Sequence, residues 1–239
     1  MPSATAKGPG PRAVVPCFRT RDVLFSVAMK SQDILLLLKL ASLEHQEGLV
    51  AGLVLKATLG IPDDWRGWQD DLLPPSAAPS LEDEAWTVRG LEESTGISKS
   101  QVSGALRRCV SVGLAHADRR NGRLRANTRA LHGFVMAGLK YVFPAQRGSQ
   151  ARGIPTAYAA PVLAGRLFSS GEQVEIWEDP QGLLLGQRIE PLHPTVPYAV
   201  RKDAALYAML ALIDAIRLGR ERESALAGEM LAGYLKVGA

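Results

Sequence analysis

The feature that most restricts the fold is a pair of short helix signals separated by a single glycine. Thr87 is a capping residue that can open the first helix, and Gly96 suits the tight left-handed turn that ends it. Ser98 can then cap a second helix over residues 99–112. Two helices joined in this way bury a small shared core, which requires apolar residues at fixed offsets. These residues are Leu91, Ile97, Val102, Ala105 and Leu106. The spacing predicts a helix-turn-helix.

A β-hairpin is predicted directly after the second helix. Residues 114–117 and 124–126 are short strand-like segments, and the Asn121-Gly122 dipeptide between them is the strongest short-range hairpin signal. A further helix is predicted over 128–140, where apolar residues recur at helical spacing. In this order the hairpin is the wing of a winged helix-turn-helix.

The positive charge of the chain is concentrated in one stretch. Residues 97–152 hold 11 Lys and Arg against the single acid Asp118, a balance of +10, whereas the whole chain has a net charge of +4. A solvated face usually mixes both signs, because a cluster of one sign repels itself. A polyanion is therefore the expected partner of this stretch, with a basic surface kept for solubility as the alternative.

Double-stranded DNA is the polyanion that these elements fit best. The second helix would enter the major groove by its N-terminal half, where short hydroxyls and an amide can reach phosphates and base edges. The arginines that follow would meet the flanking backbone, and those of the hairpin could enter the minor groove. The candidate DNA-binding residues are Thr87, Ser98, Lys99, Ser100, Gln101, Ser103, Arg107, Arg108, Arg119, Arg120, Arg123 and Arg125.

Residues 86–126 resemble the winged helix-turn-helix of MarR-type bacterial transcription regulators. The matching text is TVRGLEESTGISKSQVSGALRRCVSVGLAHADRRNGRL, and the likeness extends over 29–140 if the flanking helices are included. The resemblance implies a sequence-specific DNA-binding regulator, a homodimer that reads a palindromic operator. Glu92 departs from the family, which usually has a small alanine there, so its side chain must turn outward or the helices pack more loosely. Gly104 stands where a basic or polar residue is common.

The rest of the chain is predicted to be helical near both ends and broken by prolines between. The stretch 1–28 is expected to be a disordered tail, and a helix capped by Ser31 is predicted to follow it. Residues 49–59 are predicted to form another helix, and residues 61–80 a loop. Residues 143–197 contain seven prolines. Within them, the text GIPTAYAAP and EPLHPTVP is similar to little-characterised bacterial winged-helix proteins, a likeness that implies no activity.

A second hairpin and two terminal helices are predicted in the C-terminal part. Residues 173–177 and 183–189 could pair as a hairpin across a turn that contains Pro180 and Gly182. Asp203 can cap the first of the two terminal helices, and the second helix spans 220–236. The predicted fold class is therefore mainly α with small β-hairpins, an α+β fold. Its expected organisation is a tail over 1–28, a winged helix-turn-helix DNA-binding domain over 29–142, and a C-terminal region over 143–239 for dimerisation or partner binding.

Several other functions are not favoured by the sequence. The two cysteines, Cys17 and Cys109, cannot form a disulfide framework and suit the reducing cytoplasm. The apolar runs are too short to span a bilayer, and the N-terminus lacks the order of a secretory signal. The four histidines have no metal-ligand spacing, and no phosphate-binding glycine loop or nucleophile elbow occurs. We therefore expect no enzyme, no metal and no cofactor. Cys109 is interpreted as a small buried residue, with a redox sensor as the alternative.

The sequence allows more than one interpretation of the partners of this chain. The apolar runs 34–43 and 204–218 are candidates for a dimer surface, and burial within the monomer is the alternative for both. A second class of function is an antitoxin or adaptor whose C-terminal half, 143–239, binds a partner protein. RNA binding is a weaker third possibility, because the basic stretch lacks the aromatic residues on which single strands stack.

Overall fold

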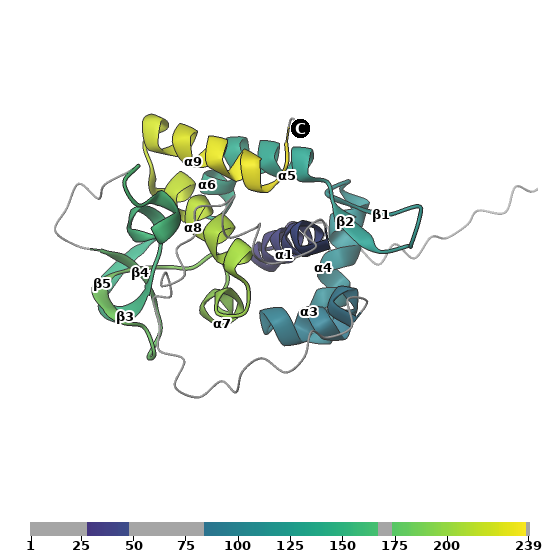
Figure 1. Cartoon of the computed structure of the whole chain (residues 1–239), viewed down its shortest axis with the longest axis horizontal. Coiled ribbons are helices and arrows are strands. Elements are labelled where there is room, and N and C mark those ends of the chain that lie inside the picture. The colour runs from purple at the N-terminus through teal and green to yellow at the C-terminus, as the bar shows by residue number, and fades with distance from the viewer. Residues whose placement is uncertain (1–27, 48–83, 167–173, 238–239) are drawn as a thin grey trace, which may run out of the picture.

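A computed structural model of the chain describes residues 28–47, 84–166 and 174–237 (Figure 1). The tail predicted over 1–28 (apart from Ala28), the helix over 49–59 and the loop over 61–80 lie outside the described residues.

The fold belongs to the mixed α+β class, as predicted, with a two-stranded hairpin and a small three-stranded sheet among helices (Figure 1). The helices are α1 (Ser31–Glu47), α3 (Val88–Thr95), α4 (Lys99–Ser111), α5 (Thr128–Phe134), α6 (Lys140–Val142), α7 (Val196–Val200), α8 (Ala204–Leu218) and α9 (Glu221–Tyr234). The strands are β1 (Ala115–Ala117), β2 (Leu124–Ala126), β3 (Arg147–Pro155), β4 (Glu175–Glu178) and β5 (Leu184–Ile189).

Helix α1 is the central helix of the fold. Its apolar residues between Ile34 and Leu43 are buried and pack against α4, β2 and α8. The core also encloses an ion pair, in which Lys39 Nζ lies 2.7 Å from the Asp203 carboxylate at the start of α8. Helix α8 is buried along nearly its whole length as well. For the runs 34–43 and 204–218, the alternative of burial within the monomer is therefore the one that the structure shows, and neither run is free as a dimer surface.

The pair α3 and α4 follows the predicted pattern at its first helix and at its turn. Thr87 Oγ1 accepts a hydrogen bond from the amide of Gly90 (3.0 Å), which satisfies one of the free amides at the start of α3. Gly96 ends the helix with φ +72°, the left-handed conformation that a side chain disfavours. The turn therefore depends on glycine at this position.

The start of α4 differs from the prediction. Ser98 occupies the capping position but makes no capping bond, because its hydroxyl is hydrogen-bonded to the side chain of Gln101 (3.1 Å). The amide of Lys99 instead donates to Glu92 Oε1 at 3.2 Å. Glu92 thus turns outward from the contact between the helices, which was one of the two alternatives for this residue.

The hairpin and the helix after it are confirmed. Strands β1 and β2 are antiparallel, with Ala115 opposite Ala126, and Gly122 has φ +72° in the connecting loop. The helix predicted over 128–140 begins at Thr128 and reaches Val142 through a π-helical turn over Val135–Leu139, which separates α5 from α6.

The second hairpin prediction is wrong in its pairing. Residues 173–177 and 183–189 were expected to be antiparallel neighbours, but β4 and β5 run parallel. Both strands are antiparallel to β3, where Gly153 pairs with Glu178 on one side and with Leu184 on the other. Two strands that are both antiparallel to a third must be parallel to each other. Because β4 and β5 also pair directly, with Glu175 opposite Gln187, the three-stranded sheet closes on itself. Strand β3 is not among the predicted elements, and its backbone hydrogen bonds to both β4 and β5 replace the predicted antiparallel pairing of these two strands.

The C-terminal helices complete one continuous core. Asp203 Oδ1 accepts the amide of Leu206 (3.0 Å) and caps α8, as predicted, and Gly219 separates α8 from α9. Buried side chains of α1, α4, α8 and α9 belong to the same apolar cluster. In the part of the chain that the structure describes, no helix is long and apolar enough to cross a membrane.

Candidate nucleic-acid interface

One face of α4 carries a stripe of small and basic residues. Val102, Ala105, Leu106 and Cys109 lie on the other side and are buried in the core that α4 shares with α1 and α3. Because residues three and four apart share a helix face, the outward positions line up. They are Ser100, Ser103, Gly104, Arg107 and Ser111. The sequence has no acid between 97 and 117, so α4 itself contributes only neutral or positive groups to this stripe.

The N-terminal end of α4 extends the stripe. Ser98, Lys99 and Gln101 are exposed there. Thr87, at the start of α3, is also exposed, but its hydroxyl already donates to the carbonyl of Glu84 (2.7 Å) and accepts a capping bond. Thr87 therefore has an established structural task. Ser98, Lys99 and Gln101 also have partners within the protein, since Ser98 is hydrogen-bonded to Gln101 and Lys99 pairs with Glu92, but all three remain exposed.

The two adjacent arginines of α4 have different environments. Arg107 is exposed and forms no ion pair within the described residues. Arg108 makes a two-pronged ion pair with Asp33, with Nε at 2.9 Å from one carboxylate oxygen and Nη2 at 2.5 Å from the other. The Asp33 side chain is 0% exposed and that of Arg108 is 17% exposed. The prediction that Arg108 meets the DNA backbone is not supported, because the buried carboxylate of α1 holds its guanidinium.

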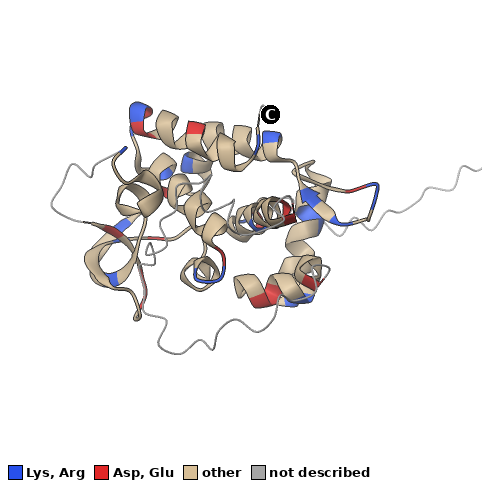
Figure 2. Cartoon of the chain, in the orientation of Figure 1, with Lys and Arg blue, Asp and Glu red and all other residues tan. Residues whose placement is uncertain are grey.

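The tip of the hairpin carries free cations. Arg119 and Arg120 are exposed and have no ion pair in the described ranges. The backbone of the tip is fixed by side chains, since Asp118 accepts the amide of Arg120 (2.8 Å) and Asn121 accepts that of Arg123 (3.0 Å). Figure 2 shows that the tip projects away from the body of the fold with Lys and Arg at its end. These two arginines are presented as the sequence predicts.

The other two arginines of the hairpin belong to its base. Arg123 and Arg125 are mostly buried and form ion pairs with Glu47 at the end of α1. Their guanidinium groups also lie over the ring of Trp86, at 5.6 and 4.6 Å from its centroid. This arrangement anchors the hairpin by ion pairing and cation–π contact. The prediction that Arg123 and Arg125 contact DNA with the other arginines of the hairpin is therefore not supported, because Glu47 and Trp86 hold both guanidinium groups.

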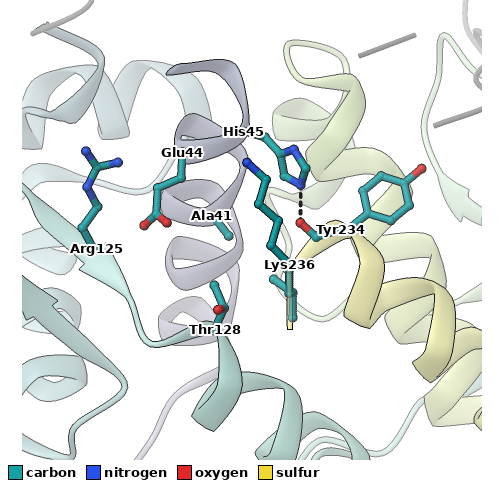
Figure 3. Close-up of a pocket in the computed structure, with 8 residues that line it drawn as sticks. Ala41, Glu44, His45, Arg125, Thr128, Tyr234 and Lys236 are labelled. Carbon is teal, nitrogen blue, oxygen red and sulfur yellow. Dashed lines mark hydrogen bonds between the residues drawn. The ribbon is translucent and has the colours of Figure 1, made fainter. Parts of the chain in front are cut away.

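A small pocket lies behind the base of the hairpin (Figure 3). It has a volume of about 240 Å³ and is enclosed by α1, β2, the start of α5 and the end of α9. Its lining is formed by Ala41, Glu44, His45, Arg125, Thr128, Tyr234, Leu235 and Lys236. Glu44 accepts the amide of Ala126 (3.2 Å), and burial raises the pKa of this carboxyl group. His45 contacts the carbonyl of Tyr234, and burial lowers the pKa of its imidazole.

The structure also bears on the alternatives for Cys109 and for metal binding. The Cys109 side chain is fully buried, and desolvation raises the pKa of its thiol to about 12. A redox-sensing cysteine needs an accessible thiolate, which this residue does not offer. Among residues 28–47, 84–166 and 174–237, no group of His, Cys, Asp and Glu could hold a metal ion.

The structure therefore divides the predicted contacts into two sets. The outward set consists of Ser98, Lys99, Ser100, Gln101, Ser103, Arg107, Arg119 and Arg120, of which Lys99 also pairs with Glu92 at 3.6 Å. Thr87, Arg108, Arg123 and Arg125 form the other set and are engaged within the protein. The residues that engage Arg108, Arg123 and Arg125 could not be identified from the sequence; they are Asp33, Glu47 and Trp86. Residues 1–96 hold more Asp and Glu than Lys and Arg, which indicates that acidic partners are present but not which acid pairs with which arginine.

Comparison of the chain with family models, with curated proteins and with solved structures finds no match.

Proposed function

We propose that this protein is a sequence-specific DNA-binding transcriptional regulator of winged helix-turn-helix type, in which α4 is the recognition helix and the β1–β2 hairpin is the wing. The single observation that carries the proposal is the outward stripe of α4 together with the exposed cations of the hairpin tip. Both surfaces are free of ion pairs that would compensate Arg107, Arg119 and Arg120 within the described residues. Uncompensated cations on a projecting hairpin and on a helix of suitable width are what a duplex requires.

The mechanism assigns different tasks to the two surfaces. Ser100, Gln101 and Ser103 are small enough for α4 to approach the floor of the major groove, and Gln101 can form two hydrogen bonds with an adenine. Arg119 and Arg120 neutralise phosphates or enter the adjacent minor groove. Arg123 and Arg125 set the position of the wing through Glu47 and Trp86, without touching DNA themselves.

The experiment that tests this function compares two duplexes of equal length, one from the DNA upstream of the protein's own gene and one scrambled. Fluorescence anisotropy at several salt concentrations gives the affinity and its salt dependence. A regulator is expected to prefer its operator by about a thousandfold or more and to lose affinity steeply with salt. Equal and weak binding to both duplexes would reject sequence-specific recognition.

A palindromic operator requires two copies of the protein, so we also propose a homodimer. Helices α1 and α8 are excluded as its surface by their burial. Sedimentation equilibrium with and without the operator tests this proposal. A monomer that binds DNA in a one-to-one complex would contradict it.

One observation favours a second candidate function, a protein-binding adaptor. Three consecutive leucines are exposed where β5 begins: Leu183, which precedes the strand, and Leu184 and Leu185, its first two residues, are exposed by 45%, 40% and 68%. A run of three exposed apolar residues is unusual on a surface without a partner. Under this proposal, a protein that co-purifies with the full chain is lost from the Leu185→Asp variant, while DNA affinity is unchanged. Unchanged co-purification with this variant would contradict a role for the leucines.

A further inference from the structure

Glu92 brings a negative charge to the start of the recognition helix. Its Oε1 accepts the amide hydrogen of Lys99 at 3.2 Å, and its Oε2 lies 3.6 Å from Lys99 Nζ. The Glu92 side chain is 34% exposed and that of Lys99 is 62% exposed. One carboxylate therefore occupies both the first amide of α4 and the ammonium group that begins the outward stripe.

The groups that Glu92 occupies are the ones that would attract a phosphate. The first amides of a helix lack partners within the helix, and its N-terminus carries a partial positive charge. An ammonium group beside this end adds a full positive charge. A phosphate of DNA that approached Lys99 would have to displace the Glu92 carboxylate or bind next to it, and the two anions repel each other.

Resting on the proposed DNA-binding function, we propose that Glu92 lowers the affinity of this protein for DNA of any sequence by competing with a backbone phosphate for Lys99. Glu92 acts through Lys99 and not by touching the DNA, because its carboxylate contacts the amide and the ammonium group of Lys99. The effect is independent of sequence, since neither group that it occupies reads a base edge.

The substitution Glu92→Gln separates the charge from the capping bond. A glutamine keeps an oxygen that can accept the Lys99 amide, so the start of α4 stays capped. Only the negative charge is lost. The variant is expected to bind both the operator and the scrambled duplex about three- to fivefold more tightly, the upper part of the range for an exposed ion pair. The log–log salt slope is expected to become steeper by up to about 0.9, because one more phosphate contact forms.

The chain offers a matched control on the next residue. Glu93 lies on the same helix, its side chain is 58% exposed, and its carboxylate pairs with Arg89 of α3 at 2.9 Å. Glu93→Gln removes the same charge at nearly the same place, so long-range electrostatics are equal in the two variants. We expect the affinity of Glu93→Gln for both duplexes to change by less than about twofold, since salt screens exposed charges that do not contact the DNA or a group that binds it.

A double-mutant cycle tests whether Glu92 acts through Lys99. In a Lys99→Gln background the gain from Glu92→Gln should largely disappear, because the ammonium for which the two anions compete is absent. Thermal unfolding supplies a readout that separates this role from a structural one. Loss of a favourable contact should leave the melting temperature of Glu92→Gln unchanged or lower, while DNA affinity rises.

The results for these variants either support or reject the competition between Glu92 and a phosphate. Tighter binding and a steeper salt slope for Glu92→Gln, absent from Glu93→Gln and reduced in the Lys99→Gln background, support it. If the unmodified protein prefers its operator but Glu92→Gln binds no more tightly, the competition is rejected and the DNA-binding function stands. If neither protein binds DNA at any salt concentration, both the function and the competition are rejected.

Discussion

Two neighbouring arginines of α4 are predicted to respond in opposite ways to the same substitution. Arg108→Ala leaves the buried Asp33 carboxylate without its guanidinium, whereas Arg107→Ala removes an exposed side chain. Removing one partner of a buried ion pair generally costs about 3–5 kcal/mol. Asp33 keeps the hydrogen bond from the Lys30 amide (2.9 Å), and Arg108 is partly open to solvent, so water can enter the space it leaves.

The expected loss of stability is therefore below the general range. We expect Arg108→Ala to lower the free energy of unfolding by about 2–3 kcal/mol, just below the cost of breaking a fully buried ion pair. A chain of this length would then melt about 5–10 °C lower. Arg107→Ala should stay within about 0.5 kcal/mol of the unmodified protein, as exposed substitutions do. Arg108→Lys keeps the charge but not the two-pronged geometry, so it should fall between the two.

DNA binding should show the reverse pattern. Arg107→Ala is expected to weaken binding to every duplex and to flatten the salt slope by about 0.9, because one phosphate contact is lost. Arg108→Ala should leave both unchanged at a temperature where the variant is folded. Urea unfolding followed by circular dichroism gives the stabilities, and fluorescence anisotropy gives the affinities. If Arg108→Ala were as stable as the unmodified protein and lost the same salt slope as Arg107→Ala, the assignment of Arg108 to the core would be refuted.

Three further predictions concern other parts of the fold. Gly104→Ala should raise the free energy of unfolding in urea by about 1 kcal/mol, because the new Cβ meets only Arg108 Nη1 at an ordinary 3.5 Å; a destabilised variant would contradict this reasoning. Burial lowers the pKa of His45 and of His193, so as the pH falls these imidazoles take up protons in the unfolded chain before they do so in the folded protein. The free energy of unfolding should therefore fall as the pH drops below about 6.5, the ordinary pKa of histidine. Urea unfolding at pH 7.5 and 5.5 measures this loss, which His45→Gln should reduce; equal stability at both pH values would be inconsistent with buried neutral imidazoles. Cys109 should resist iodoacetamide at pH 8 until urea is added, as followed by peptide mass spectrometry, and rapid labelling of the native protein would show that the thiol is accessible.

Local signals predicted the α3–α4 pair and the hairpin because each depends on residues close together in the sequence. Thr87 caps its own helix, Gly96 supplies the left-handed turn and Gly122 the hairpin loop. These features are determined by backbone conformations that few residues adopt. The same holds for Asp203, which caps α8 as predicted.

Contacts between distant residues could not be predicted in the same way. Nothing close to Arg108 in the sequence shows that Asp33, 75 positions earlier, will hold its guanidinium. The parallel pairing of β4 with β5 depends on β3, which could not be predicted because the sequence Arg147-Gly-Ser-Gln-Ala-Arg152 at its start has little β propensity. The arginines of the hairpin look alike in sequence, but only those near its base reach Glu47 and Trp86.

The most direct test of the account removes the cations at the tip of the wing. The double substitution of Arg119 and Arg120 by alanine should weaken binding to operator and scrambled DNA and flatten the log–log salt slope by up to about 1.8, the value for two phosphate contacts. Alanine substitution of Arg220 and Arg222, which are exposed at the start of α9 far from the hairpin (Figure 1), removes the same charge and should leave the slope unchanged. Equal slopes for the two double variants would show that the wing does not contact DNA and would contradict the proposed function.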